Sequence, residues 1–474
     1  MEEVVASKKN IKNVLIVLIG NIFTIVSSIL IGFFIPKMME VEAYGYYKAF
    51  ALYFEYAVFL SVGFSDGIYL MFAGTSYKDL NVPLFRMFSK ILMISQAIFA
   101  ILCCGISIFF IQTAYGFIFF FVGISIFFSN LLNYFQYLSR LTEQYKQLTV
   151  RDMLKAILNI GSVVTLFVMY MLGKFDALSF RIYIVIYVSI LALITIVYAF
   201  NYRQILFGKS LKVKNEYAIV GKIFKLGIPL LIANFVNSFI LIIDKQFVNV
   251  LYDVEVYGIY AFAYSMMGFI TTAISAISTV LFPVLKKFTK DGLKDKYVNL
   301  VSAIAIVVAV CLSGYFPIKW ICEHYLQKYV SSLTYFKIIL PGLMISSPIT
   351  LVMFNYYKSM DAIVEFFIKS AVVLAIAFLL DLGAYFIFKT PVAISVASII
   401  TFVIWYVVIE FKFYRLWKLN YWKNAVFLLS VAGAFYLITM LIENVYISFG
   451  IWMASLVVLV LTFHFKLIKN KFRI

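Results

Sequence analysis

The stretch IYIVIYVSILALITIVYAF, residues 182–200, decides the fold, because it carries no charged side chain over 19 residues. As an α-helix rising 1.5 Å per residue, it nearly spans a hydrocarbon core about 30 Å thick. Comparable apolar runs recur along the whole chain. We predict fourteen membrane helices, at residues 14–36, 46–73, 87–111, 115–138, 153–172, 182–200, 224–250, 259–285, 298–318, 335–357, 363–388, 391–411, 425–442 and 445–465.

The composition agrees with an all-α polytopic membrane protein of about 14 helices. Of 474 residues, 64% are hydrophobic and only 13% are charged, whereas about 25% are charged in an average soluble domain. A soluble enzyme, a DNA-binding domain and a disulfide scaffold are thereby excluded. The four cysteines and two histidines lack metal-ligand spacing, and no P-loop or catalytic triad is evident. We therefore expect no catalytic residues, no metal and no cofactor.

The basic residues predict the orientation in the membrane. With the fourteen spans above, 31 of the 40 Lys and Arg residues lie on the side of the N-terminus, and nine lie on the other side. Because cytoplasmic loops collect Lys and Arg, both termini are expected in the cytoplasm of a multi-pass plasma-membrane protein. The net charge of +18 is then a topology signal that also matches anionic lipid, and nucleic acid is not an expected partner.

An internal repeat divides the chain. The pattern V-E-x-Y-G-x-Y occurs at residues 41–47 and again at 254–260, and the same offset of 213 places Asn21 on Asn234. Convergence on an interfacial aromatic belt is the alternative explanation. A duplication predicts two pseudo-symmetric six-helix lobes, with substrate bound between them. The predicted divisions are an N-terminal lobe at 1–200, a cytoplasmic linker at 201–223, a C-terminal lobe at 224–411, and helices 13 and 14 with a basic tail at 412–474.

Charged residues in the predicted second span are candidates for a polar cavity. Lys48, Glu55 and Asp66 are separated by 7 and 11 residues, so a continuous helix would place all three on one face. Because an ionised side chain in hydrocarbon costs at least about 2.5–3.5 kcal/mol, such groups usually face a cavity or a partner. The alternatives are ordinary polar helix contacts and, for Lys48, a side chain that extends to the membrane surface.

The seventh span repeats this polar pattern. Asn234, Asn237 and Asp244 follow at intervals of 3 and 7, beside Lys245. Asp381 in the eleventh span is an intermediate case. Lys245 is expected to be the only cation deep in the first eight spans, apart from Lys48 near the rim. Four residues further predict bends that could serve alternating access or be ordinary kinks: Gly227 and Pro229 at the opening of the seventh span, and Pro341 and Pro348 in the tenth.

Several motifs resemble one family. The segments GFSDGIYL at 63–70, GIPLL at 227–231 and VYGIYAFAY at 256–264, together with Asp244-Lys245, are similar to those of Wzx-type polysaccharide flippases. These belong to the multidrug/oligosaccharidyl-lipid/polysaccharide (MOP) exporter superfamily. The resemblance implies a V-shaped pair of lobes, helices 13 and 14 as an addition, and a polyprenyl-diphosphate-linked oligosaccharide that moves from the cytoplasmic to the outer leaflet.

The resemblance also implies roles and partners. Substrate-binding roles are expected for Lys245, Asn21, Asn234, Asn237 and Lys48. Ion coupling or charge balance is expected for Asp66, Glu55 and Asp244. The expected partners are the lipid-linked glycan and membrane lipid, with a polysaccharide polymerase and glycosyltransferases as further candidates.

Three rival functions remain open at this point. A cation-coupled multidrug or metabolite antiporter of the same superfamily would share the fold and the acidic residues. A membrane-embedded glycosyltransferase or polymerase would normally need a larger external loop than this chain offers. A structural scaffold or channel is the third rival. The flippase interpretation is the one that the motifs favour.

Overall fold

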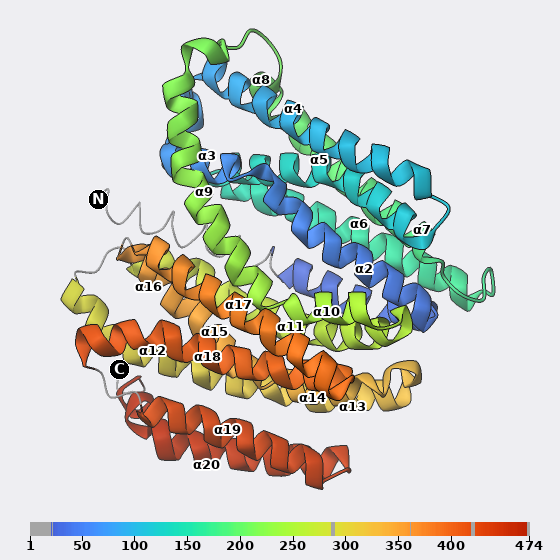
Figure 1. Ribbon diagram of the computed structural model, residues 1–474, viewed down its shortest axis with the longest axis vertical. Coiled ribbons are helices and arrows are strands. Elements are labelled where there is room, and N and C mark those ends of the chain that lie inside the picture. The colour runs from blue at the N-terminus through green and yellow to red at the C-terminus, as the bar shows by residue number, and fades with distance from the viewer. Residues whose placement is uncertain (1–19, 21, 286–289, 361, 419–421, 472–474) are drawn as a thin grey trace. The chain divides into compact units, whose positions relative to one another are not determined.

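The computed structural model of the chain describes residues 20, 22–285, 290–360, 362–418 and 422–471 (Figure 1). Within these ranges the regular structure is helical and contains no strand. Eleven of the described helical segments are long and apolar enough to cross a membrane. The other three predicted spans correspond to a shorter apolar helix at Ile22–Met38, an interrupted helix at residues 41–72, and the helix Val254–Leu285.

The chain forms two compact units, residues 1–235 and 236–474. The first contains Ile22–Met38, α2 (Val41–Ala57), α3 (Phe64–Phe72), α4 (Val82–Ser107), α5 (Ala114–Leu141), α6 (Tyr145–Met171), α7 (Phe180–Asn201), α8 (Arg203–Leu206) and most of α9 (Tyr217–Ile240). The change of unit falls inside α9, and the predicted linker boundaries at 201–223 stay a prediction.

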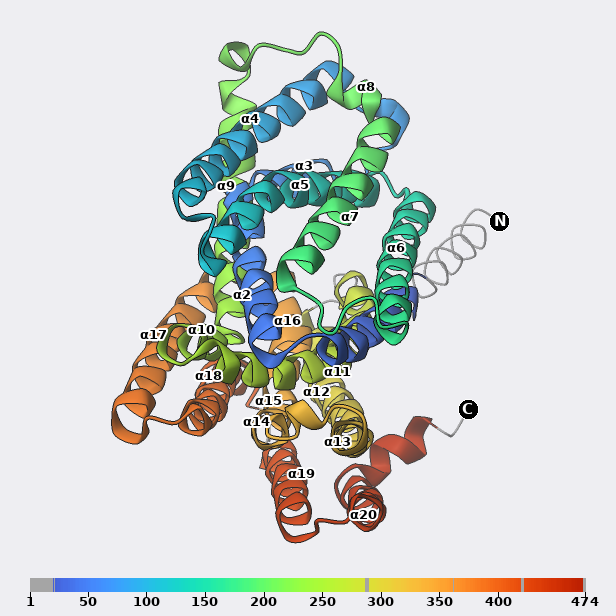
Figure 2. The same cartoon turned by 90° about the vertical axis from the view of Figure 1, so that its right-hand side faces the viewer.

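Aromatic packing forms the core of the first unit. Helix α5 packs against both α4 and α7 there (Figure 2). Phe135 of α5 stacks on Tyr198 and Tyr202, with ring centres 6.0 and 5.6 Å apart, and Phe64 meets Phe88 edge-on at 5.9 Å. Because lipid is as apolar as these side chains, such packing contributes mainly through close van der Waals contact.

The predicted second span is not one helix. It bends between α2 and α3, where Val62 and Gly63 adopt left-handed backbone conformations with φ of 52° and 74°. At this bend the backbones of α3 and α9 nearly touch, since a Cβ on Gly227 would lie 1.9 Å from the Gly63 carbonyl oxygen. The sequence predicted Gly227 and Pro229 at the start of the seventh span. Helix α9 begins at Tyr217, so both residues lie inside it.

The connector between α7 and α9 is held on α4. The Arg86 guanidinium donates to the carbonyl oxygens of Gln204 and Lys209, at 2.7 and 3.2 Å, and Lys90 donates to the Ser210 hydroxyl at 2.9 Å. Gly208 (φ 116°) lies so close that a Cβ there would be 2.6 Å from the Arg86 guanidinium carbon. The connector is thus part of the first unit and not a free tether.

Arg86→Ala is expected to loosen this connector, because two charge-assisted hydrogen bonds of about 1.5–3 kcal/mol each would be lost. Limited trypsin digestion of the purified protein should cut at Lys209, Lys212 or Lys214 at least about tenfold faster than in the wild type. Lys78→Ala, which removes an exposed cation near α4, serves as the control. Equal cleavage rates for the two variants would show that Arg86 does not hold the connector.

The second unit contains the end of α9 and the remaining helices. These are α10 (Ile243–Leu251), α11 (Val254–Leu285), α12 (Lys290–Cys311), α13 (Tyr315–His324), α14 (Ser332–Ile339), α15 (Gly342–Ser347), α16 (Phe354–Ser359), α17 (Ile363–Phe388), α18 (Pro391–Trp417), α19 (Trp422–Leu441) and α20 (Val445–Lys471). Helices α17 and α18 pack as a pair, and so do α19 and α20. A buried Trp405 on α18 donates to the Ser370 hydroxyl of α17 at 3.1 Å.

Two predicted spans of this region are interrupted. The seventh breaks at Leu241 and Ile242, between α9 and α10, a position that no proline marks. The tenth bends where predicted: α15 begins directly after Pro341, and Pro348 begins a π-helical segment that ends at Met353. Proline lacks the backbone N–H that would continue the helical hydrogen bonding, which explains the irregularities at Pro341 and Pro348.

The repeat pattern marks equivalent helix starts, since α2 begins at Val41 and α11 at Val254. Its tyrosines are packing residues: Tyr44, Tyr47, Tyr257 and Tyr260 are all buried. Residues that face water or lipid at an interfacial belt would be exposed instead.

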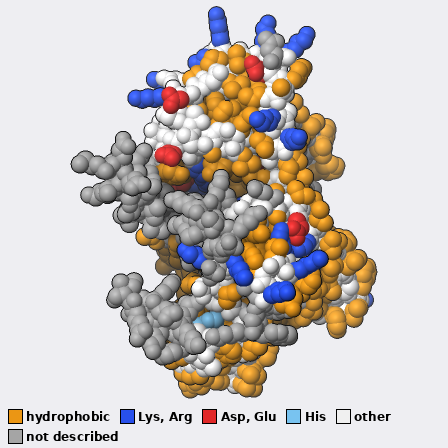
Figure 3. All heavy atoms as spheres, turned by 90° about the vertical axis from the view of Figure 1, so that its left-hand side faces the viewer, with side chains coloured by type: hydrophobic (Ala, Val, Ile, Leu, Met, Phe, Trp, Pro, Cys, Tyr) orange, Lys and Arg blue, Asp and Glu red, His pale blue; other side chains and the backbone are white. Residues whose placement is uncertain are grey.

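The outer surface suits a lipid environment. Large hydrophobic side chains are highly exposed, among them Phe109, Ile101 and Phe200 in the first unit and Ile387 and Leu441 in the second. Figure 3 shows broad hydrophobic areas on one face. Soluble monomers rarely expose patches of this extent, so these helices are covered by hydrocarbon.

Candidate functional site

A cluster of ionised and aromatic side chains lies within the first unit, inside apolar helices. Asp66, in the first turn of α3, is 6% exposed and accepts a hydrogen bond of 2.9 Å from the Tyr137 hydroxyl. Tyr137 of α5 stacks on Tyr69, and the Arg140 guanidinium lies 5.7 Å from the Tyr137 ring centre. The positive end of the α3 dipole also favours a carboxylate at this position.

Helix α6 adds further charges to this unit. Asp152 accepts a 3.2 Å hydrogen bond from the Gln136 amide and interacts electrostatically with Lys155, Arg140 and Arg151. Arg151 is 5% exposed, and Lys155 is half-buried. Three cations and the two acids Asp66 and Asp152 are therefore held among α3, α5 and α6.

Hydrogen bonds fix the aromatic wall at the end of α7. The Tyr202 hydroxyl lies 2.7 Å from the Ser139 hydroxyl and donates to Gln144 Oε1 at 3.2 Å. Burial raises the pKa of the Tyr202 phenol, which keeps the hydroxyl protonated and able to donate.

A second polar cluster lies within the second unit, around Asp244 at the start of α10. Asp244 is 1% exposed and accepts hydrogen bonds from the hydroxyls of Tyr260 (2.7 Å), Tyr264 and Ser398 (3.0 Å), and from the Lys245 backbone N–H (2.8 Å). These donors come from α10, α11 and α18. Four donors from three helices therefore converge on one buried carboxyl group.

Asp381 of α17 belongs to the same cluster. It is 1% exposed and interacts electrostatically with Asp244. Neither of its carboxylate oxygens has a hydrogen-bond partner among the described residues. A buried pair of interacting carboxyl groups of this kind is a candidate site for a proton or a bound cation.

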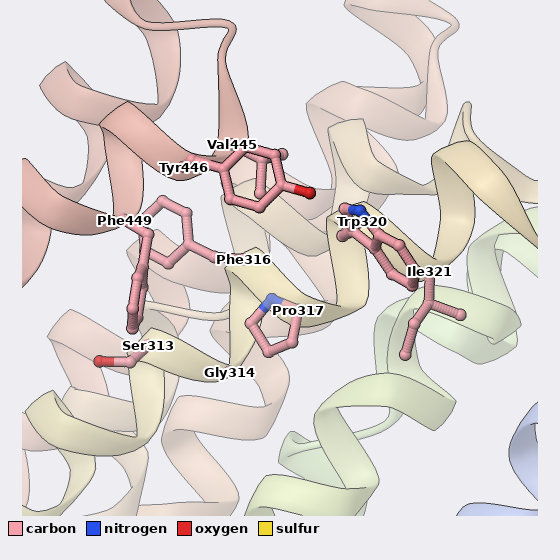
Figure 4. Close-up of a pocket in the computed structure, with 9 residues that line it drawn as sticks. All are labelled: Ser313, Gly314, Phe316, Pro317, Trp320, Ile321, Val445, Tyr446 and Phe449. Carbon is pink, nitrogen blue, oxygen red and sulfur yellow. The ribbon is translucent and has the colours of Figure 1, made fainter.

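An apolar pocket of about 670 Å³ lies elsewhere in the second unit, between α13 and α20 (Figure 4). Phe316, Pro317 and Trp320 form one wall, and Tyr446 and Phe449 face them. Its lining is almost entirely hydrocarbon, which offers little hydrogen bonding to a sugar. We therefore place the polar chemistry in the two charged clusters.

Comparison with known proteins identifies the family. The sequence model of the family described as "Polysaccharide biosynthesis protein" matches residues 34–316, more than half of the chain. The chain belongs to this polysaccharide biosynthesis family. None of the curated proteins matches its sequence.

Solved structures place this family member in a known fold. The lipid II flippase MurJ in an inward closed conformation is similar with a TM-score of 0.69 and 13% identity, covering 97% of this chain and all of that one. An outward-facing MATE multidrug resistance transporter of the MOP superfamily follows at 0.56 and 12%, covering 86% and 96%. A MOP superfamily transporter from Pyrococcus furiosus gives 0.52 and 10%, covering 86% and 96%. The polysaccharide biosynthesis protein thus has the MOP fold.

The structure separates the residues that the sequence predicted as one polar face in the second span. Lys48 and Glu55 lie on α2 and Asp66 on α3, so the bend at Val62–Gly63 invalidates the argument from a continuous helix. Lys48 Nζ lies 5.2 and 5.1 Å from the ring centres of Tyr44 and Tyr47, and Glu55 is exposed. Their roles stay predictions.

The seventh-span residues are divided in the same way. Asn234 and Asn237 are half-buried on α9, whereas Asp244 and Lys245 lie on α10, so the polar pattern does not run along one continuous helix. Lys245 Nζ lies 5.3 Å from the Tyr264 ring centre. Asn21 lies outside the described residues.

The expectation that Lys245 is the only deep cation stays a prediction, but it did not take the cations Arg151 and Lys155 into account. Helix α6 begins at Tyr145 instead of residue 153, so it includes Arg151, while Lys155 already lay within the predicted span. In the sequence these cations follow the polar segment TEQYKQ at 142–147 and resemble a loop flank. Their spacing of four residues, which places them on one helical face, was the available signal.

Proposed function

We propose that this protein flips a polyprenyl-diphosphate-linked oligosaccharide from the cytoplasmic to the outer leaflet by alternating access, for cell-surface polysaccharide biosynthesis. The observation that carries the proposal is the family match over residues 34–316. The fold shared with a lipid II flippase supports a lipid-linked substrate. The protein is proposed to lie in the plasma membrane with both termini in the cytoplasm, an orientation that the distribution of Lys and Arg supports.

The two charged clusters support the transport of a hydrophilic lipid headgroup by this protein. Charged groups inside apolar helices are costly and persist where they serve a pathway or a substrate. Lys245, Asn234, Asn237, Asn21 and Lys48 are proposed to contact the diphosphate and the sugars, while the polyprenyl tail remains in lipid. A polymerase and glycosyltransferases are the proposed partners that use and supply the glycan.

Ion coupling is proposed for Asp244, with Asp381 as its partner. Asp244 accepts hydrogen bonds from the hydroxyls of Tyr264 and Ser398 and interacts electrostatically with the buried Asp381. Such an oxygen-rich group suits a proton or an alkali cation better than an organic cation. Asp66 and Glu55 are proposed to balance charge in the first unit.

Flipping can be tested directly with reconstituted protein. In proteoliposomes that carry a fluorescent polyprenyl-diphosphate oligosaccharide in both leaflets, the protein should raise transbilayer exchange, read as quenching by an impermeant reductant, at least about tenfold over protein-free vesicles. A polyprenol lacking diphosphate and sugar serves as the control lipid. No acceleration with correctly folded protein would refute the flippase.

A cation-coupled multidrug antiporter is the second candidate, because the buried acid pair Asp244–Asp381 would equally serve to couple drug efflux to a proton or sodium gradient. The fold shared with MATE transporters is compatible with it. Efflux of rhodamine or ethidium from vesicles driven by a proton or sodium gradient, together with no glycolipid exchange, would select this function over the flippase.

A further inference from the structure

The break between α2 and α3 contains a strained backbone. Val62 has φ 52° and ψ 31°, in the left-handed region, and Gly63 follows with φ 74°. This conformation suits glycine but disfavours a β-branched residue by roughly 5–30-fold. The Val62 side chain is 42% exposed, so its own packing offsets little of this cost. Strain of this kind persists only where the surrounding structure enforces it, and it is found at switch regions.

The internal repeat indicates that the helical layout does not require this break. The V-E-x-Y-G-x-Y pattern begins both α2 and α11, at an offset of 213 residues. At that offset Val62 and Gly63 correspond to Ser275 and Ala276. Helix α11 continues through both of these residues as one helix. The break is therefore a local feature of the first copy of the pattern.

Two buried amide side chains bind carbonyl groups at the break. Asn130 of α5 donates from Nδ2 to the Ala57 carbonyl oxygen at 3.0 Å, and Gln96 of α4 donates from Nε2 to the Leu60 carbonyl oxygen at 3.1 Å. Asn130 Nδ2 also donates to Gln96 Oε1 at 2.7 Å, so the two amides form one network. Both side chains are almost completely buried. Because the last carbonyls of a helix lack intrahelical partners, these bonds stabilise the interrupted form.

A continuous helix would exchange these partners. In an α-helix the carbonyl oxygens of Ala57 and Leu60 would accept hydrogen bonds from the backbone N–H groups four residues further on. The two amides would then lose their carbonyl acceptors, and Val62 would take a right-handed conformation without strain. Two discrete arrangements are therefore available: the amides favour the interrupted one, and the backbone of Val62 favours the continuous one.

We propose that Val62–Gly63 is a conformational hinge, and that Gln96 and Asn130 are positioning residues that hold it in the interrupted state. Asp66 lies three residues beyond Gly63, in the first turn of α3. A change at the hinge therefore also moves the carboxylate that accepts a hydrogen bond from Tyr137. The hinge deepens the alternating-access mechanism proposed above, and it rests on that function only for the transport measurement below.

The two arrangements can be distinguished by electron–electron resonance between spin labels on the full chain in nanodiscs. The labels are attached at Glu42→Cys on α2 and Leu70→Cys on α3, both exposed, after the four native cysteines are replaced by alanine. A continuous helix places these positions about 42 Å apart, and the interrupted helix gives a second distance. Gln96→Met or Asn130→Leu should shift the populations at least about tenfold toward the continuous helix. Val62→Gly should shift them at least about fivefold toward the interrupted one.

Stability provides a second measurement, for which Val58→Gly is the matched control. Glycine normally destabilises a helix relative to valine, and Val58 has a right-handed backbone with φ −63°, so this control should lower the melting temperature. Val62→Gly instead relieves strain and should raise the melting temperature by about 2–4 °C. If it lowers the melting temperature as much as the control does and leaves the label distances unchanged, the proposal is wrong.

Glycolipid exchange in proteoliposomes links the hinge to transport. Val62→Gly should flip at least about fivefold more slowly than the wild type despite its higher stability, and adding Gln96→Met should restore the rate, because the two changes bias the hinge in opposite directions. If the label populations shift as expected but the wild type does not flip glycolipid, the proposed function fails and the hinge stands. If the wild type flips while Val62→Gly changes neither the rate nor the populations, the hinge is refuted and the proposed function stands.

Discussion

Asp244→Asn is expected to reduce ion-driven transport to less than about a tenth of the wild-type rate while the protein still folds. The asparagine retains the shape and can accept hydrogen bonds from Tyr260 and Ser398, but it removes the charge that would hold a proton or cation. Each loss of about 1.4 kcal/mol in cation binding lowers the affinity tenfold. The measurement is substrate exchange in proteoliposomes as a function of the imposed proton or sodium gradient.

Asp381→Asn should separate transport from stability. Its carboxylate oxygens have no hydrogen-bond partner among the described residues and lie near the Asp244 charge, so neutralising it should leave the melting temperature equal or higher. Transport should nevertheless fall as in Asp244→Asn. Asp253→Asn, at an exposed position between α10 and α11, is the control and should retain full activity. Normal gradient dependence in both buried variants would exclude this pair from coupling.

Gly227→Ala is expected to destabilise the first unit by at least about 3 kcal/mol, more than ordinary overpacking. The added Cβ would lie 1.9 Å from the Gly63 carbonyl oxygen and 2.7 Å from the Gly67 backbone nitrogen, and neither backbone atom can move without shifting α3. For a unit of this size, the melting temperature of the purified protein should fall by about 6–12 °C.

Gly221→Ala provides the comparison on the same helix. A Cβ there meets nothing within 4 Å, so the better helix propensity of alanine should leave stability unchanged or raise it by up to about 1 kcal/mol. If Gly227→Ala melts at the same temperature as Gly221→Ala, α3 and α9 do not pack as closely as described.

The sequence identified the correct elements because the apolar character of a membrane helix is a local property. The predicted span at 363–388 coincides with α17, and the repeated V-E-x-Y-G-x-Y pattern begins α2 and α11. Asp244 was recognisable as a functional candidate because a carboxylate in an apolar run is costly wherever it lies. Pro341 and Pro348 likewise predicted the interruptions of the tenth span, because proline lacks a backbone N–H group wherever it occurs.

Helical faces were harder to predict, because they depend on unbroken periodicity. At Val62–Gly63 and at Leu241–Ile242 one helix ends before the next begins, so the helical repeat does not continue across these positions. No composition signal distinguishes Leu241 and Ile242 from their neighbours. A single break was therefore enough to invalidate the grouping of Glu55 with Asp66 and of Asn237 with Asp244.

By itself, the sequence determined the fold class, the approximate position of most membrane helices and some of their buried charged residues, since each follows from the transfer of a residue between water and hydrocarbon. Only the tertiary structure decided the partners of those residues. Asp244 interacts electrostatically with Asp381, 137 positions along the chain, and the Arg151 guanidinium lies near the rings of Tyr198 and Tyr202. Hydrogen bonds and electrostatic contacts join residues that are far apart in the sequence, so the sequence of one helix does not show which neighbouring side chains will pair with its buried charges.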